Sequence, residues 1–305
     1  MSFGKILGRA WEITWRWKAL WVLGFLVSLS EGWFQIGNRT NWSERQGGHI
    51  PPEMGGILVS LACIGVVIGI ILWVLAVISR GALIGGVQQV EETGETTLGQ
   101  AWRAGLSRFW TLFGIGILTG LPILIMVFVI IAAFAGPLLA DVAISGHGEP
   151  RAGILFSLLC GMPLCCLAIA GGIVLSQIQK YADRAAVLEG LDWIDAIKRG
   201  WQVLKENLAP TVILWLIFFG IGLVLFVIVG GSVLVLSLPF IGILSSTDPG
   251  AWILIPVVCG GLLMVIVGAV VGSVIETFTS ATWTLAYREM AGLTTPPPKA
   301  ETSIA

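Results

Sequence analysis

Short amphipathic segments and long apolar segments alternate along the chain, and this alternation occurs three times. The short segments each carry a tryptophan directly after a small residue, at Ala10-Trp11, Ala101-Trp102 and Gly200-Trp201. In each segment apolar residues recur at helical spacing on one face and basic or polar residues on the other, which predicts a short amphipathic helix. A pair of apolar stretches follows each of these helices, so the pattern predicts three similar units.

The apolar stretches are long enough to cross a lipid bilayer as helices, because a span takes about 20 apolar residues. Six stretches reach this length, at residues 19–36, 55–79, 110–135, 152–178, 209–235 and 252–287. The third and fifth run on past it and are interrupted at Gly136-Pro137 and at Pro239, which predicts that each bends into a re-entrant or interfacial piece. The expected fold class is therefore all-α: a polytopic membrane protein with six transmembrane helices. We expect three pseudo-repeated hairpins, each preceded by an amphipathic interfacial helix.

The repeat also sets the expected domain organisation. Residues 1–290 form a single membrane domain in this interpretation, with repeats at about 2–92, 96–189 and 191–290. Residues 291–305 are polar and include three consecutive prolines, so we expect a disordered, proline-rich tail.

Composition excludes several classes of protein. Hydrophobic residues make up 56% of the chain and charged residues 11%, with a mean hydropathy of +0.93, which does not fit a soluble domain. The net charge of -1 leaves no basic surplus for nucleic acid. The five cysteines form no C-x-x-C pair, and no histidine lies near them, so we expect neither a metal site nor a cofactor.

The basic residues are distributed unevenly between the two ends of the apolar stretches. Of 17 lysines and arginines, all but Arg39, Arg45 and Arg151 fall on one side. Because short cytoplasmic loops carry an excess of lysine and arginine, both termini are expected in the cytoplasm. The predicted location is the cell (cytoplasmic) membrane, with the chain crossing it several times.

Two residue types recur where the chain is expected to meet the membrane surface. Tryptophan is enriched at the bilayer interface, and an arginine near the end of a span can extend its charge to the headgroups. The predicted interfacial anchors are Trp11, Trp102, Trp201, Arg80, Arg184 and Arg288. The short helices would then contact the lipid bilayer, or alternatively pack only on cytoplasmic extensions of the helix bundle.

Glu276 is an ionisable residue inside the sixth apolar stretch, with Thr279 and Ser280 beside it. Burying a carboxylate in a membrane is costly unless it is paired or neutral, so such a residue is a functional candidate. A purely structural role is the alternative, with Glu276 bonded to a polar residue of the fourth stretch such as Gln177. The candidate intramembrane polar site comprises Glu276, Thr279, Ser280 and Gln177.

The tryptophan-bearing helices and the exits at Arg80, Arg184 and Ala286-Tyr287-Arg288 resemble a prokaryotic family of six-helix membrane proteins of largely unknown role. That family is related to the membrane domain that precedes glycerophosphoryl diester phosphodiesterases, and the likeness covers most of residues 1–290. The His-Arg-Gly catalytic triplet of those enzymes does not occur in the sequence, and we expect no soluble barrel after the membrane part. The resemblance therefore implies the membrane fold, and we expect no phosphodiesterase activity.

Motifs for a catalytic nucleophile, a metal or a phosphate loop do not occur in the sequence, so we expect the protein not to be an enzyme. The first candidate function is a non-enzymatic scaffold that binds lipid or a membrane-protein partner. The second is a transporter or channel for a small molecule or ion, in which repeated hairpins enclose a site at Glu276.

Overall fold

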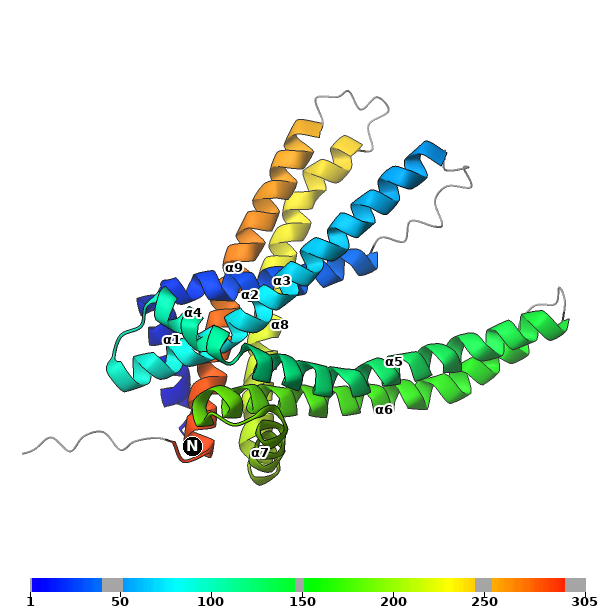
Figure 1. Ribbon diagram of the computed structural model, residues 1–305. Coiled ribbons are helices and arrows are strands. Elements are labelled where there is room, and N and C mark those ends of the chain that lie inside the picture. The colour runs from blue at the N-terminus through cyan, green and yellow to red at the C-terminus, as the bar shows by residue number, and fades with distance from the viewer. Residues whose placement is uncertain (1, 40–51, 146–150, 245–253, 294–305) are drawn as a thin grey trace, which may run out of the picture. The chain divides into compact units, whose positions relative to one another are not determined.

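The computed structural model describes residues 2–39, 52–145, 151–244 and 254–293, and these residues are helical apart from short turns (Figure 1). No strand occurs within them, so the all-α prediction is confirmed for this part of the chain. The helices are α1 (Phe3–Arg16), α2 (Ala19–Arg39), α3 (Pro52–Thr93), α4 (Leu98–Ser107), α5 (Phe109–Ser145), α6 (Arg151–Arg184), α7 (Trp193–Glu206), α8 (Leu208–Leu244) and α9 (Leu254–Met290), with a π-helical turn η1 (Ala185–Glu189) after α6.

Local sequence signals explain where several helices begin and end. Thr97 and Gln100 form a capping box before α4, in which each backbone N–H donates to the other side chain, at 3.2 and 3.3 Å. Glycines at positive φ end α3, η1 and α9, because the left-handed conformation that closes a helix is free of strain for glycine. These three residues are Gly94, Gly190 and Gly292.

Five helices are long and apolar enough to cross a membrane in the part of the chain that the structure describes. They are Cys63–Thr93, Phe109–Pro137, Ser157–Glu189, Leu208–Ile228 and Ile266–Met290. The first expected span, 19–36, lies on α2, of which the described apolar part Ala19–Ser30 is shorter than a span. A multi-pass membrane protein therefore fits these helices.

The expected breaks in the third and fifth spans are wrong. Helix α5 runs for 37 residues with Pro122 and Pro137 inside it, and α8 runs for 37 residues past Gly230-Gly231 to Leu244. A proline removes one backbone hydrogen bond, and long helical flanks on both sides can keep the helix going past it. Similarly, α3 continues beyond Arg80 to Thr93, so this arginine does not mark a helix end.

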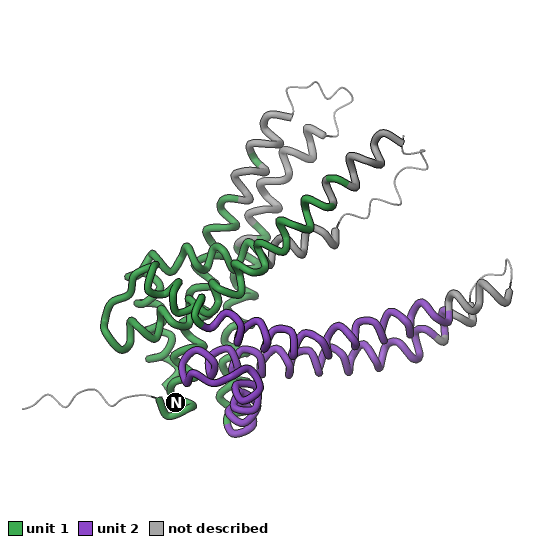
Figure 2. The backbone as a smooth tube through the Cα atoms, in the orientation of Figure 1, with its two compact units in different colours: residues 1–107, 207–305 green, residues 108–206 purple. Residues whose placement is uncertain are grey.

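Two compact units make up the chain (Figure 2). Unit 1 combines residues 1–107 with 207–305, and unit 2 comprises residues 108–206. Unit 2 consists of the α5–α6 hairpin, whose helices run side by side, followed by α7 (Figure 1). Within this unit the short helix packs with the hairpin that precedes it in the chain, whereas the sequence pattern grouped each short helix with the hairpin that follows.

Helices α4 and α7 each cross the preceding long helix at a glycine. A Cβ added at Gly105 of α4 would overlap the carbonyl oxygen of Ile78 and lie 2.7 Å from the backbone nitrogen of Ala82, both on α3. At Gly200 of α7 a Cβ would lie 2.8 Å from the backbone nitrogen of Ala182 on α6. The backbones are therefore in direct contact at both crossings, and any side chain would separate them.

Helix α1, the first described helix, packs against α9, the last described one. Its Ile6, Ala10 and Ile13 are buried. The ring of Trp11 contacts that of Phe278 on α9 edge to face, with a centroid separation of 5.9 Å. The first and last described helices thus pack on each other within unit 1.

Helices α2 and α9 form a second close crossing in unit 1. A Cβ at Gly24 would overlap the Ser273 carbonyl oxygen and the Thr277 hydroxyl. The Thr277 hydroxyl donates to the carbonyl oxygen of Leu20 at 3.3 Å and to that of Ser273 at 2.8 Å. Further along α9, the buried Trp283 stacks on Phe218 of α8 with centroids 6.0 Å apart.

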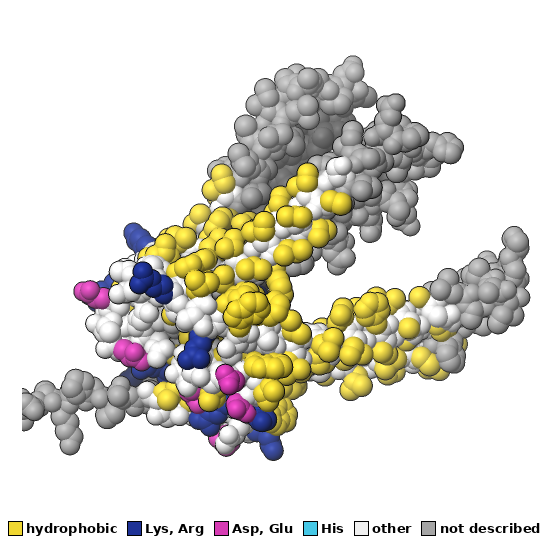
Figure 3. Space-filling model, in the orientation of Figure 1, with side chains coloured by type: hydrophobic (Ala, Val, Ile, Leu, Met, Phe, Trp, Pro, Cys, Tyr) yellow, Lys and Arg dark blue, Asp and Glu magenta, His cyan; other side chains and the backbone are white. Residues whose placement is uncertain are grey.

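Large apolar side chains cover the outside of the long helices (Figure 3). Phe128 on α5, Leu155 on α6 and Phe226 on α8 are 64%, 73% and 76% exposed. Exposing this much contiguous apolar surface to water is unfavourable. Such a surface is normal for a protein whose helices face lipid tails. Within each unit, charged side chains gather instead near the short helices, where Figure 3 shows them.

The crossing of α4 over α3 predicts opposite effects for two glycines of one helix. Gly105→Ala should lower the free energy of unfolding by about 1–3 kcal/mol, because a methyl group there forces the two backbones apart. Gly99 has nothing within 4 Å of an added Cβ, so Gly99→Ala should leave the stability unchanged or raise it by up to about 1 kcal/mol. Thermal unfolding in detergent measures both, and equal stability of the two variants would contradict the close crossing.

Candidate functional site

Glu276 lies on α9 and is half-buried. It is the one ionisable residue between Ile266 and Tyr287, in a stretch that is apolar or hydroxyl-bearing. Glu276 takes part in an interaction within the structure, so it is not without a partner.

Hydroxyl groups surround Glu276 along α9, and most of them bond within their own helix. Thr282 donates to the Phe278 carbonyl oxygen at 2.8 Å, and Thr284 donates to that of Ser280 at 2.7 Å. Ser280 is buried and Thr279 is half-buried. A threonine that donates to the carbonyl one turn earlier is satisfied without a ligand, so these hydroxyls have a structural explanation.

The fourth member of the predicted polar site, Gln177, lies on α6 in unit 2, while Glu276, Thr279 and Ser280 lie in unit 1. Gln177 is 7% exposed, and its Oε1 accepts no hydrogen bond from the described residues. Because these four residues are divided between the two units, their grouping into one site stays a prediction.

The six predicted anchors differ in exposure. Trp11 and Trp201 are 53% and 46% exposed, and Trp102 is half-buried. Arg184 and Arg288 are buried, and Nη1 of Arg184 donates to the carbonyl oxygen of Lys180 at 2.6 Å. The tryptophans are thus available at the surface, whereas these two arginines lie inside protein.

The short helices α1, α4 and α7 each have three distinct sides. Successive residues project about 100° apart, so a residue that follows a buried one lies just over a quarter turn from it. In all three helices the tryptophan directly follows a buried small residue, in the pairs Ala10-Trp11, Ala101-Trp102 and Gly200-Trp201. The third side is polar. It holds the residue directly before the small residue and the residues two and six positions after it. These positions hold Arg9, Glu12 and Arg16 in α1, Gln100, Arg103 and Ser107 in α4, and Arg199, Gln202 and Glu206 in α7.

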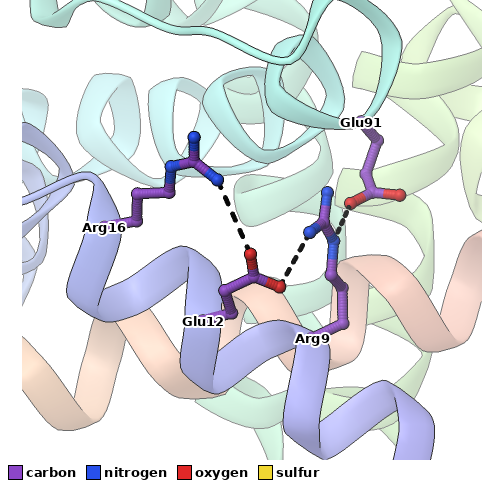
Figure 4. Close-up of polar contacts among 4 residues, drawn as sticks. All are labelled: Arg9, Glu12, Arg16 and Glu91. Carbon is purple, nitrogen blue, oxygen red and sulfur yellow. Dashed lines mark hydrogen bonds and ion pairs between the residues drawn. The ribbon is translucent and has the colours of Figure 1, made fainter.

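A charge network joins α1 to the end of α3 (Figure 4). Arg9 Nε donates to Glu91 at 2.8 Å, Arg9 Nη1 donates to Glu12 at 2.8 Å, and Arg16 lies 3.7 Å from Glu12. The hydrogen bond to Glu91 raises the pKa of Arg9, so its guanidinium stays charged throughout the physiological range. Because Arg9 is 40% exposed, the pair with Glu91 contributes about 1 kcal/mol or less.

Unit 2 has a comparable contact at α7. Arg199 Nε lies 3.3 Å from a Glu189 carboxylate oxygen, and Arg108 Nη1 donates to the Gly190 carbonyl oxygen at 3.2 Å. Arg199 directly precedes Gly200, as Arg9 directly precedes Ala10. Both arginines therefore tie a short helix to a glutamate near the polar end of a long helix.

These inter-helix pairs were not predicted from the sequence. The spacing of Arg9, Glu12 and Arg16 by three and four residues is readable as a helix-surface pattern. Glu91 is 82 residues from Arg9, and no local pattern identifies it.

The potential metal ligands and thiols can be located in the part of the chain that the structure describes. No group of three or more histidine, cysteine, aspartate or glutamate residues there could hold a metal ion. The described cysteines Cys63, Cys160, Cys165 and Cys166 are free thiols.

Comparison with protein-family models matches residues 47–290 to one family, described as a domain of unknown function (DUF7847). No curated protein and no solved structure matches the chain.

Proposed function

The chain belongs to the DUF7847 family, and on that premise we propose that it is a non-enzymatic membrane scaffold whose short helices bind lipid or a membrane-protein partner. The observation that carries this proposal is the exposed tryptophan side of α1 and α7, each on a helix whose buried side is held by a long apolar helix. Tryptophan on the surface of a membrane protein is typical of the interface between lipid and water. The partners implied are the bilayer itself and other membrane proteins.

The proposed architecture has six spans in three pseudo-repeated hairpins, with α2 as the first span. Two kinds of glycine position support it. One comprises the crossings of α4 on α3 and of α7 on α6, and the other comprises the glycines at positive φ that end α3, η1 and α9. The remaining short helix, α1, likewise packs on a long helix, α9. The relation to the membrane domain of glycerophosphoryl diester phosphodiesterases belongs to this proposal and concerns the fold alone.

The proposed location is the cell membrane with both termini in the cytoplasm. The asymmetry of lysine and arginine supports this orientation, since the short helices and the ends of α6 and α9 carry most of the basic residues.

Cysteine labelling tests the orientation. In a background with the native cysteines replaced by alanine, Glu95→Cys, Asp195→Cys and Ser43→Cys are each treated with a membrane-impermeant maleimide on intact cells. Only Ser43→Cys should be labelled, and the other two should react after permeabilisation, because Glu95 and Asp195 lie among the basic segments. Labelling of Glu95→Cys or Asp195→Cys on intact cells would show that the orientation is wrong.

A transporter is the second candidate function, because a half-buried acid lies within an apolar helix. Breaks within the spans would also favour a transporter, but α5 and α8 run unbroken. The two functions differ in what the carboxyl group of Glu276 must do: a scaffold needs its hydrogen bonds, whereas a transporter needs its proton or charge.

The Glu276→Gln variant separates these functions. An amide keeps much of the hydrogen bonding, so the scaffold proposal expects a change in unfolding free energy of under about 1 kcal/mol. It also expects proton and potassium leak through protein-containing liposomes to equal that of the unchanged protein. Glu289→Gln, the same chemical change near the end of the same helix, is the matched control. Flux through the unchanged protein that Glu276→Gln abolishes and Glu289→Gln preserves would replace the scaffold proposal by transport.

A further inference from the structure

The N-terminal helix α1 exposes a fixed group of aromatic rings. Trp11 and Trp15 are 53% and 46% exposed, with ring centroids 5.5 Å apart. Trp15 contacts Trp21 of α2 at 5.3 Å, and the indole N–H of Trp21 donates to the Thr14 carbonyl oxygen at 2.7 Å. The rings therefore hold one another in place at the turn between α1 and α2, and their apolar edges remain uncovered.

Positive charge lies at the same turn. The Arg16 guanidinium stacks 5.1 Å above the Trp17 ring, its side chain is 68% exposed, and Lys18 follows on an exposed position. We call Trp15, Arg16, Trp17, Lys18 and Trp21 the aromatic–basic corner. Aromatic rings and basic side chains together match the layer of a bilayer where glycerol and phosphate groups lie.

The charge of this corner is not balanced by its own helix. Residues 2–18 contain four basic residues and one acid, Glu12. Glu12 is 2.8 Å from Arg9 and 3.7 Å from Arg16, so it is shared, and Arg9 already pairs with Glu91. Arg16 and Lys18 thus hold most of the surplus positive charge.

Helix α7 has similar aromatic exposure without that surplus. Trp193 and Trp201 are 45% and 46% exposed. Residues 192–206 contain three basic and three acidic residues, and Lys198 pairs with Asp195 at 3.1 Å. Helix α7 therefore provides a matched comparison within the same protein, in which the rings are kept and the net charge is absent.

We infer that the aromatic–basic corner binds the headgroups of anionic phospholipids. The tryptophan rings lie at the glycerol level, and Arg16 and Lys18 contact the phosphate, for which a guanidinium offers paired hydrogen bonds. The uncompensated positive charge makes the corner selective for anionic over zwitterionic lipid, and α7 lacks this surplus charge. This inference rests on the proposed function, because the corner must lie at a membrane surface.

Lipid binding to the purified full-length protein in detergent tests the inference. Native mass spectrometry measures the dissociation constants of phosphatidylglycerol and phosphatidylcholine for three proteins: the unchanged chain, Arg16→Gln/Lys18→Gln, and Lys198→Gln/Lys205→Gln. Both variants remove two positive charges from exposed positions on a short helix or directly after it, so folding should be retained and is checked by thermal unfolding.

The expected result is tighter binding of phosphatidylglycerol than of phosphatidylcholine by the unchanged chain. Arg16→Gln/Lys18→Gln should weaken phosphatidylglycerol binding by about 30-fold, and Lys198→Gln/Lys205→Gln by about threefold or less. Equal loss in both variants, or no preference for the anionic lipid, would overturn the inference. Displacement of the lipid by millimolar inorganic phosphate would also overturn it, since it would identify a site for free phosphate.

Failure of the proposed function gives a different result. If the protein is extracted from membranes by alkaline carbonate, it is not an integral membrane protein and the scaffold proposal fails. A protein that resists carbonate but shows no anionic preference leaves the scaffold proposal standing and refutes the aromatic–basic corner alone.

Discussion

Backbone contact between a short helix and a membrane-length helix is the interaction on which the rest of the structure depends. Helices in lipid gain little from the hydrophobic effect, so they associate where small residues let backbones approach. Gly105 and Gly200 provide such approaches within units 1 and 2, and each anchors a helix of 10 or 14 residues. Helices this short are marginal by themselves, so the contact that holds them also determines which of their sides stay exposed.

Much of the fold could be predicted from the sequence, and the errors have identifiable physical causes. Helical periodicity and apolar length predict the short helices and most of the spans, and Thr97 with Gln100 predicts the cap of α4 that the structure contains. Periodicity cannot assign a short helix to the long helix before it or after it, because both are joined to it by a few residues. Pro137 reads locally as a helix breaker, yet the apolar residues on both sides keep α5 helical.

The sequence singles out Glu276 as a candidate residue, but it does not predict the long-range contacts around it. Glu276 stands out because every nearby residue is apolar or bears a hydroxyl, and that contrast needs no structure. The hydrogen bonds that satisfy Thr277 include one to Leu20, 257 residues away, and the partner of Arg9 is 82 residues away. Contacts between segments so distant follow from tertiary packing, which one sequence does not encode in any local pattern. Likewise, which side of α1 is exposed depends on which side packs against α9, and no local pattern encodes that contact.

We propose that α1 occupies on α9 the place that α4 occupies on α3, so that the first and last described helices form one packed pair. A circular permutant tests this most directly: the chain begins at Glu95, runs to Ala305, and continues from Ser2 to Gly94. The account predicts membrane insertion and a melting temperature within a few degrees of the natural chain, because α1 then follows α9 as α4 follows α3. It also predicts that deleting residues 2–17 from this permutant destabilises it strongly. A permutant that fails to insert, or one that is indifferent to the loss of α1, would contradict the account.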